Sequence, residues 1–185
     1  MCYTVGGKEI LQIVPGQKGS SKGKKHGASM KIYTLEVFII SGPVTKKYVK
    51  KNPVVSRTIE VRGDQTLEDL HHAIFKAFDR EDEHMYEFQF SGKGPNDPNA
   101  RRYGLSMPFE GGLQQVELPG DVTKTTLDAL RLRKDEAFGY WFDFGDDWWH
   151  QINVLSIEKK TPTGKYPRVI KRIGKSPPQY IDTDE

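Results

Sequence analysis

The chain has 185 residues, of which 36% are hydrophobic and 29% charged. This length and balance predict one domain with a buried core, rather than two domains or a disordered chain. The aliphatic and aromatic run at residues 37–40 is far too short to cross a membrane. Cys2 is the single cysteine, which excludes a disulfide framework or a cysteine-based zinc site within one chain. Because no signal-like segment opens the sequence, we expect a cytoplasmic protein without membrane association.

The net charge of +3 is unevenly distributed along the chain. Residues 1–29 carry five Lys against one Glu, and residues 159–185 carry seven basic residues against three acids. The part between them holds sixteen basic and twenty-one acidic residues, so the body is acidic and both ends are basic. Solvated tails are the favoured interpretation of such blocks. The basic ends and the lysines of residues 46–51 leave nucleic-acid binding as a weakly supported alternative, because the body shows no clustered basic face.

The composition predicts three parts. Residues 1–29 form a flexible N-terminal extension, because their Gly, Ser and Lys run at 16–27 offers almost nothing to bury. Residues 30–175 form a single α+β domain, with a mixed or antiparallel sheet and a few helices. Residues 176–185 form a C-terminal tail.

The elements follow from periodicity. Strands are predicted at residues 31–41, 57–62 and 86–90. Residues 42–56 are expected to connect the first two, with an edge strand around Tyr48, and residues 92–104 are expected to form a loop rich in Gly, Pro and Asn. A helix is predicted after Thr66, which together with Asp69 makes a near capping box. Its apolar stripe comprises Leu67, Leu70, Ile74, Ala77 and Phe78.

Two histidines lie side by side on this helix. At about 100° per residue, His71 borders the apolar stripe and His72 points away from it. A surface role is therefore predicted for His72. For His71 a border position with a satisfied hydrogen bond is favoured over a role as ligand or base.

A second strand-to-helix unit echoes the first. Residues 59–70 and residues 116–130 share an apolar strand, a Gly-Asp turn, a Thr cap and a Leu-acid-x-Leu helix start, with a longer loop in the second unit. This similarity suggests duplicated strand-helix units that bury leucines under one sheet.

The most unusual stretch is the aromatic and acidic segment 138–152, which contains all three Trp residues. Its β-favouring flanks around Gly145-Asp146-Asp147 predict a hairpin. With an even-length loop centred on Asp146 and Asp147, Asp143 is expected opposite His150 on one face of the sheet.

Three interpretations of this hairpin remain open. The first is a metal site with the candidate ligands Asp143, Asp146, Asp147 and His150. The favoured alternative is structural: the two acids at 146 and 147 make the turn, and Asp143 accepts a hydrogen bond from His150. Because no recognised ligand spacing is present, no metal or other cofactor is predicted. The third is a binding surface for a basic peptide or protein patch. Its candidate residues are Tyr140, Trp141, Asp143, Asp146, Asp147, Trp148 and His150.

The hairpin also carries a family resemblance. The run Tyr140-x-Phe142-Asp143-Phe144-Gly145-Asp146-x-Trp148-x-His150 resembles the signature of the root-inducing-plasmid open-reading-frame-three-like family. Three earlier elements match in order: Tyr33-x-Leu35, Thr66-Leu67-x-x-Leu70-His71 and Thr126-Leu127-x-x-Leu130. The resemblance covers residues 30–175 and departs from the pattern at Lys134-Asp135, where a Gly-Asp turn is more typical.

The resemblance implies a plasmid-borne α+β protein without an established activity or cofactor. Members have been labelled transposon resolvases, but this sequence shows neither a serine-recombinase arrangement nor a helix-turn-helix. We therefore expect a non-enzymatic accessory or interaction domain from a plasmid or other mobile element. The alternatives are a metal-dependent hydrolase or nuclease that uses the hairpin, and a nucleic-acid-associated protein.

Overall fold

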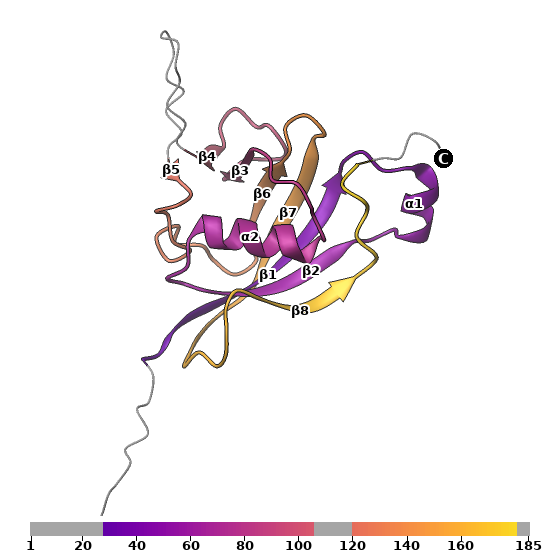
Figure 1. Cartoon of the computed structure of the whole chain (residues 1–185). Coiled ribbons are helices and arrows are strands. Elements are labelled where there is room, and N and C mark those ends of the chain that lie inside the picture. Colours follow the sequence, from indigo (N-terminus) through magenta and orange to yellow (C-terminus); the bar gives the residue numbers. More distant parts are fainter. Residues whose placement is uncertain (1–27, 106–119, 181–185) are drawn as a thin grey trace, which may run out of the picture.

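The computed structural model describes residues 28–105 and 120–180, and these form one eight-stranded sheet with two helices (Figure 1). The strands are β1 (Met30–Ser41), β2 (Ser56–Arg62), β3 (Tyr86–Phe90), β4 (Arg101–Gly104), β5 (Gly120–Asp121), β6 (Ala137–Phe142), β7 (Trp148–Lys160) and β8 (Arg168–Ile173). The helices are α1 (Lys46–Lys51) and α2 (Leu67–Ala77). The predicted α+β class is therefore correct in outline, although strands dominate.

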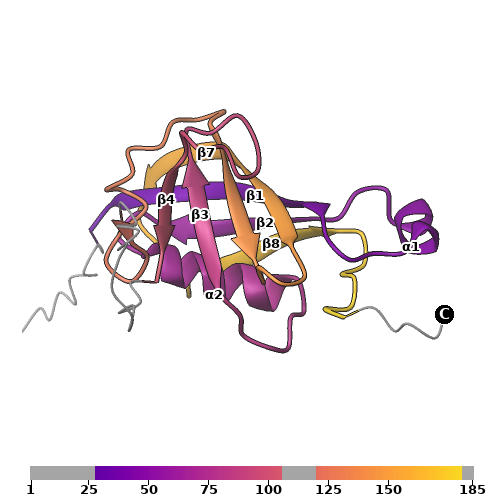
Figure 2. The ribbon, with the colours of Figure 1, turned by 90° about the horizontal axis from the view of Figure 1, so that it is seen from above.

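The sheet has the strand order β5-β4-β3-β6-β7-β1-β2-β8. Neighbouring strands are antiparallel except β4 and β5, so the sheet is mixed. The hairpin of β6 and β7 lies centrally, between β3 and β1. The sheet is strongly twisted, and α2 lies across one of its faces (Figures 1 and 2). We call this the inner face and the opposite one the outer face.

The packing of α2 explains the inner face. Leu67, Leu70 and Ile74 are buried at 1% exposure or less, as the predicted stripe requires. The capping box is present in both directions: the Asp69 backbone N–H donates to the Thr66 hydroxyl at 3.1 Å, and the Thr66 backbone N–H donates to the Asp69 carboxylate at 2.9 Å. An acid at this position therefore works as the usual Glu or Gln does, and the predicted helix is confirmed.

Two connections differ from expectation. The edge strand around Tyr48 is wrong, because the segment forms α1, whose first turn is capped when the Thr45 hydroxyl accepts from the Tyr48 backbone N–H. The loop predicted at residues 92–104 ends early, because its last four residues pair with β3 as β4. Both segments are short and polar, so their partners rather than an apolar period determine their structure.

The duplication of strand-helix units remains unconfirmed. Residues 127–131 form turns where the second helix was expected, and residues 116–119 lie outside the described ranges. The two Thr caps instead meet each other: Thr66 and Thr126 form an antiparallel bridge, and the Leu67 backbone N–H donates to the Thr125 carbonyl. The second segment thus forms backbone contacts with the start of α2 instead of a helix of its own.

The ends of the chain are described in part. Residues 1–27 of the predicted extension and residues 181–185 lie outside the described residues. Of the segment expected as a tail, Gln179 is buried and its side-chain oxygen accepts from the Glu81 backbone N–H at 2.8 Å. Its amide donates to the Asp82 carbonyl at 2.9 Å, so the segment contacts the loop between α2 and β3. Neither helix in the described parts has the length and apolar character to cross a bilayer.

Candidate functional site

The β6–β7 hairpin pairs in a different register from the predicted one. Tyr140 lies opposite His150, Trp141 opposite Trp149, and Phe142 opposite Trp148. The loop therefore has an odd number of residues, 143–147, instead of an even number. Because successive residues of a strand point to opposite faces, this shift also reverses which side chains share a face.

Asp143 is the physical reason for this register. Its backbone is left-handed, with φ of +56°, and its carboxylate accepts from the backbone N–H groups of Gly145 at 3.2 Å and Asp146 at 3.3 Å. The Asp147 backbone N–H donates back to the Asp143 carbonyl at 2.7 Å. Asp143 thus ends β6 and starts the turn, in the manner of a turn-forming Asp.

The predicted pairing of Asp143 with His150 is therefore wrong. His150 is 2% exposed on the inner face, beside Phe78 and Tyr140. Asp143 instead lies 3.5 Å from the His84 ring. Asp147 belongs to the outer side of the hairpin, where it binds the indoles of Trp141 and Trp149, so the four candidate metal ligands do not converge.

An aromatic stack covers the outer face of the hairpin. The rings of Trp141 and Trp149 stack with centroids 4.8 Å apart, and Phe144 stacks on Trp141 at 4.1 Å. Both indole N–H groups donate to the same Asp147 oxygen, at 2.8 and 2.9 Å. Phe144 is 40% exposed, so part of this stack faces solvent. We call Trp141, Phe144 and Trp149 the aromatic platform.

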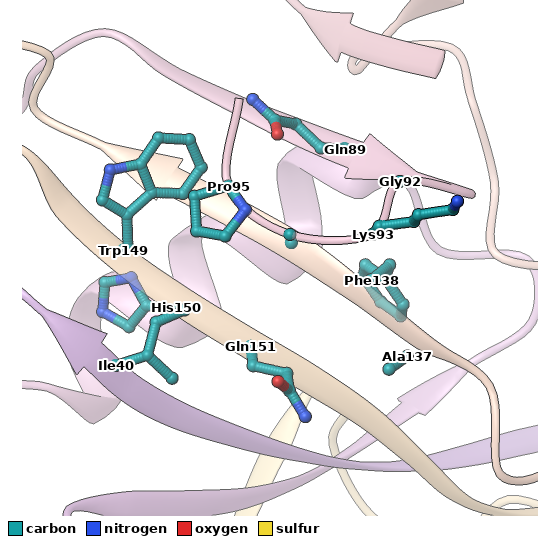
Figure 3. Close-up of a pocket in the computed structure, with 12 residues that line it drawn as sticks. Ile40, Gln89, Gly92, Lys93, Pro95, Ala137, Phe138, Trp149, His150 and Gln151 are labelled. Atoms are coloured by element: carbon teal, nitrogen blue, oxygen red, sulfur yellow. The ribbon is translucent and has the colours of Figure 1, made fainter. Parts of the chain in front are cut away.

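A hollow of about 150 Å³ adjoins the platform (Figure 3). Gly139 is one of its lining residues, lies between Gln89 of β3 and Gln151 of β7, and contributes no side chain. Trp149 and Pro95 line it, the latter from the loop between β3 and β4. That loop is held against β3 by a hydrogen bond in which the Asn96 backbone N–H donates to the Gln89 side-chain oxygen at 3.1 Å. The other lining residues are Ile40, Gly92, Lys93, Gly94, Ala137, Phe138 and His150.

The inner face of the same hairpin buries polar groups. The Arg80 guanidinium lies 3.7 Å above the Trp148 ring, and burial lowers its pKa to about 10. Burial, with Arg80 nearby, lowers the pKa of His150 to about 3, so its imidazole is neutral at physiological pH. Within the described residues, the Arg80 Nε and Nη2, the Trp148 Nε1 and both His150 nitrogens find no hydrogen-bond partner. Such a concentration of unsatisfied buried polar atoms is unusual for a packed core.

Next to this group, α2 contacts the hairpin through His71. The His71 Nδ1 and the Tyr140 hydroxyl are 2.8 Å apart, and the His71 Nε2 lies 3.2 Å from a Glu83 carboxylate oxygen. The His71 ring stacks on Tyr86 with centroids 3.6 Å apart. Burial lowers the pKa of His71 to about 4, although Glu83 opposes the shift. The hydrogen bond predicted for His71 is confirmed, as is the exposure of His72, but His71 is buried at 1% exposure rather than placed at a border.

Comparison with known proteins places these features in a family. The family described as plasmid pRiA4b ORF-3-like protein matches residues 47–183, which is well over half of the chain. The chain belongs to this family. The match includes α2, the β6–β7 hairpin and the loop that carries Glu83.

Two further relatives are uncharacterised. The chain is 28% identical over 130 residues to the uncharacterized protein y4hQ of Sinorhizobium fredii, a match that covers 70% of this chain and 60% of that relative. The crystal structure of MM3350, a protein of unknown function from Methanosarcina mazei Go1, is similar with a TM-score of 0.59 and 24% identity. That similarity covers 81% of this chain and 73% of the other, and it supports the fold alone.

The structure thus divides the seven residues predicted as a binding site. Trp141, Asp146 and Asp147 lie at the aromatic platform or its turn, whereas Tyr140, Trp148 and His150 are buried on the inner face. Asp143, the seventh, is buried where the turn begins. Residues missed by the sequence reasoning are Phe144, Gly139, Arg80 and Glu83. Gly139 carried a signal, because a Gly inside an aromatic strand marks a place where a ligand or another backbone approaches closely.

Proposed function

We propose that this family member is an interaction domain that binds a basic segment of a partner protein on its outer face. The observation that carries the proposal is the aromatic platform, which is rigidly held and partly exposed next to a hollow. Exposed aromatic groups that are already ordered lose little conformational entropy when a partner covers them. Aromatic residues are also enriched at the centres of protein interfaces.

The hydrogen bonding of Asp147 supports a platform that is formed before binding. One carboxylate oxygen holds both indole N–H groups, which fixes the two stacked rings relative to each other. Asp147 has φ of +61°, a conformation that Asp adopts more readily than most residues. The turn therefore serves the orientation of the rings as well as the reversal of the chain.

The size of the hollow indicates what enters it. Small-molecule sites usually have volumes of about 300–1,000 Å³, whereas this hollow has about 150 Å³. Such a volume suits one side chain of a partner better than a cofactor. Gln151, which pairs with Gly139 and is exposed, adds a polar side chain to the lining.

The charge of the turn favours a basic partner. Asp146 and Asp147 place two carboxylates at the edge of the platform, and the exposed Phe144 offers a ring face beside them. A Lys or Arg side chain gains from both, through ion pairing and through cation–π contact, the latter contributing about 0.5–1 kcal/mol at exposed sites. The hydrolase alternative has less support, since its candidate ligands lie on different sides of the hairpin.

Selection from a library of random displayed peptides tests this proposal. We expect enrichment of peptides that contain Lys or Arg, with affinities that fall about two- to fivefold in Phe144→Ala, the loss that corresponds to one exposed cation–π contact. Gly139→Ala should also weaken binding, because the added methyl group rises into the hollow while its nearest neighbour is the Gln89 Cβ at 3.5 Å, an ordinary contact.

The matched control is Ile170→Ala, which truncates another exposed apolar residue, on the edge strand β8. This variant should bind the selected peptides as the wild type does. Enrichment of acidic or uncharged peptides, or peptides that bind Phe144→Ala and Gly139→Ala with unchanged affinity, would refute the proposed surface.

A further inference from the structure

Away from the outer face, three potential metal ligands converge beside α2. His71 and His72 come from the helix, and Glu83 comes from the loop between α2 and β3. One ligand atom from each side chain lies within 4.8 Å of the other two. His71 is buried, whereas His72 and Glu83 are exposed, so the group lies at the edge of the core with access to solvent.

His71 is held in the orientation that a ligand needs. Its ring stacks on Tyr86 at 3.6 Å with an interplanar angle of 1°, and its Nδ1 bonds the Tyr140 hydroxyl at 2.8 Å. The Nε2 is thereby directed at Glu83. Metal-binding histidines usually have such a partner on the second ring nitrogen, which fixes the tautomer and the ring orientation.

The distances fit a metal ion with little rearrangement. Ligand atoms at about 2.0–2.2 Å from a metal lie about 3.0–3.5 Å from one another. The His71 Nε2 and the Glu83 oxygen already lie 3.2 Å apart. The His72 ligand atom lies within 4.8 Å of the other two, and its exposed ring can rotate toward them.

The hydrogen bonds of His71 also suit a ligand. A carboxylate oxygen only accepts, so in the neutral ring, which is the form that binds metals, the proton lies on the Nε2 that faces Glu83. Without a metal, Nε2–H donates to Glu83 and Nδ1 accepts from Tyr140. With a metal on Nε2, the Nδ1–H donates to the Tyr140 oxygen instead, so a hydroxyl at Tyr140 satisfies both tautomers.

We propose that His71, His72 and Glu83 form a binding site for a divalent transition-metal ion such as Zn²⁺ or Co²⁺. Two imidazoles and one carboxylate favour these ions over Mg²⁺ and Ca²⁺, which prefer oxygen ligands alone. Three protein ligands leave at least one coordination position for water or an external ligand. The site is independent of the proposed partner surface, because it lies beside the helix and not on the outer face.

Metal titration of the full chain, prepared without a histidine tag, tests the site. Zn²⁺ affinity is measured by competition with a chromophoric chelator, and Co²⁺ binding by its visible absorption. We expect one ion per chain, and a loss of affinity of at least about tenfold in both His72→Ala and Glu83→Gln, because each removes a direct ligand. Both residues are exposed, so these variants should keep the wild-type unfolding transition.

Two neighbouring substitutions serve as matched controls. His84→Ala and Glu81→Gln remove an exposed imidazole and an exposed carboxylate from the same loop, and both should bind Zn²⁺ as the wild type does. Tyr140→Phe removes the hydroxyl behind His71 and should lower the affinity about 10- to 100-fold, as loss of an outer-shell partner does. Absence of stoichiometric binding, or binding that survives both His72→Ala and Glu83→Gln, would overturn the proposal.

Discussion

The two faces of the β6–β7 hairpin differ in how they use similar residues. On the inner face, Tyr140, Phe142 and Trp148 are each at most 1% exposed and pack against α2 and its flanking segments. On the outer face, Trp141 and Phe144 remain partly accessible, and a single carboxylate orders the indoles. One strand pair therefore carries a core and a surface of nearly equal aromatic content.

This difference separates positions that hold the fold from positions available for binding. A ring buried among other rings loses its contacts when it is truncated, whereas a ring that faces solvent loses few. The outer face can therefore vary, or be covered by a partner, without loss of the domain. Substitutions of one residue type on the two faces test this directly.

The largest effect is expected at Phe142. Phe142→Ala should lower the free energy of unfolding by about 3–5 kcal/mol, because it opens a cavity between β6 and α2. Phe144→Ala, two residues away and 40% exposed, should cost less than about 1 kcal/mol. Urea denaturation of both variants measures the contrast, and equal losses would mean that the platform is part of the core.

The pH dependence of stability is expected to come from the two histidines buried at the inner face. The folded-state pKa of His150 is lowered from 6.5 to about 3, and that of His71 to about 4. Between these values and about pH 6.5 the unfolded chain binds protons that the folded chain does not, so stability is full above pH 6.5 and falls as the pH drops.

Each buried histidine contributes a slope of about 1.4 kcal/mol per pH unit within its window. His150→Phe should remove one such contribution, so the variant should lose less stability than the wild type between pH 6.5 and pH 4. Phe144→Ala is the control and should keep the wild-type slope, because it removes no titratable group. Urea denaturation at each pH gives the slopes, and identical slopes for all three proteins would contradict the burial of a neutral His150.

A glycine next to Trp148 gives a smaller effect. A Cβ built at Gly42 would lie 2.2 Å from the Trp148 Cε3, which is far inside any permitted contact. Gly42→Ala should therefore cost about 1–3 kcal/mol through overpacking. Gly94→Ala should be close to neutral, because nothing lies within 4 Å of its added Cβ. Thermal unfolding of both variants measures this contrast. If Gly42→Ala were as stable as the wild type, the close packing of Trp148 against Gly42 would be contradicted.

The sequence predicted the elements whose apolar residues recur with a clear period. The α2 stripe, its Thr66 cap and the strands β1, β2 and β3 were found in this way. The lysine-rich α1 was missed, because a short helix that buries none of its residues leaves no apolar period. Periodicity could not reveal the contact between His71 and Tyr140 either, since these residues are 69 apart in the chain.

The hairpin shows a different limit. Its existence was predictable from the β-favouring flanks, but its register depended on where the turn begins. An odd loop starts at Asp143 because that carboxylate caps two backbone N–H groups, and alternation alone does not reveal this preference. His150 therefore pairs with Tyr140, three residues before the predicted partner Asp143. As a result, His150 lies in the core and apart from the acidic residues of the turn.

The smallest effect on stability, and the most specific test of the outer face, is expected for Asp147→Asn. Asn keeps the shape of the side chain and tolerates the left-handed backbone, with φ of +61° at this position. It replaces a charged acceptor by a neutral one, so the two indole hydrogen bonds weaken and the cost should stay at or below about 1 kcal/mol.

The NMR signals of the three indole N–H groups resolve this change. Those of Trp141 and Trp149 should shift together, because both donate to Asp147, while that of Trp148 serves as an internal reference on the inner face. Asp146→Asn removes the neighbouring charge and should leave all three signals in place. If the pair shifts together and selected basic peptides bind Asp147→Asn less tightly than Asp146→Asn, then the ordered platform contributes to binding beyond the charge of the turn. If the two variants lose binding equally and no indole signal moves, then charge alone attracts the peptide and the stacked rings are only a cover for the sheet.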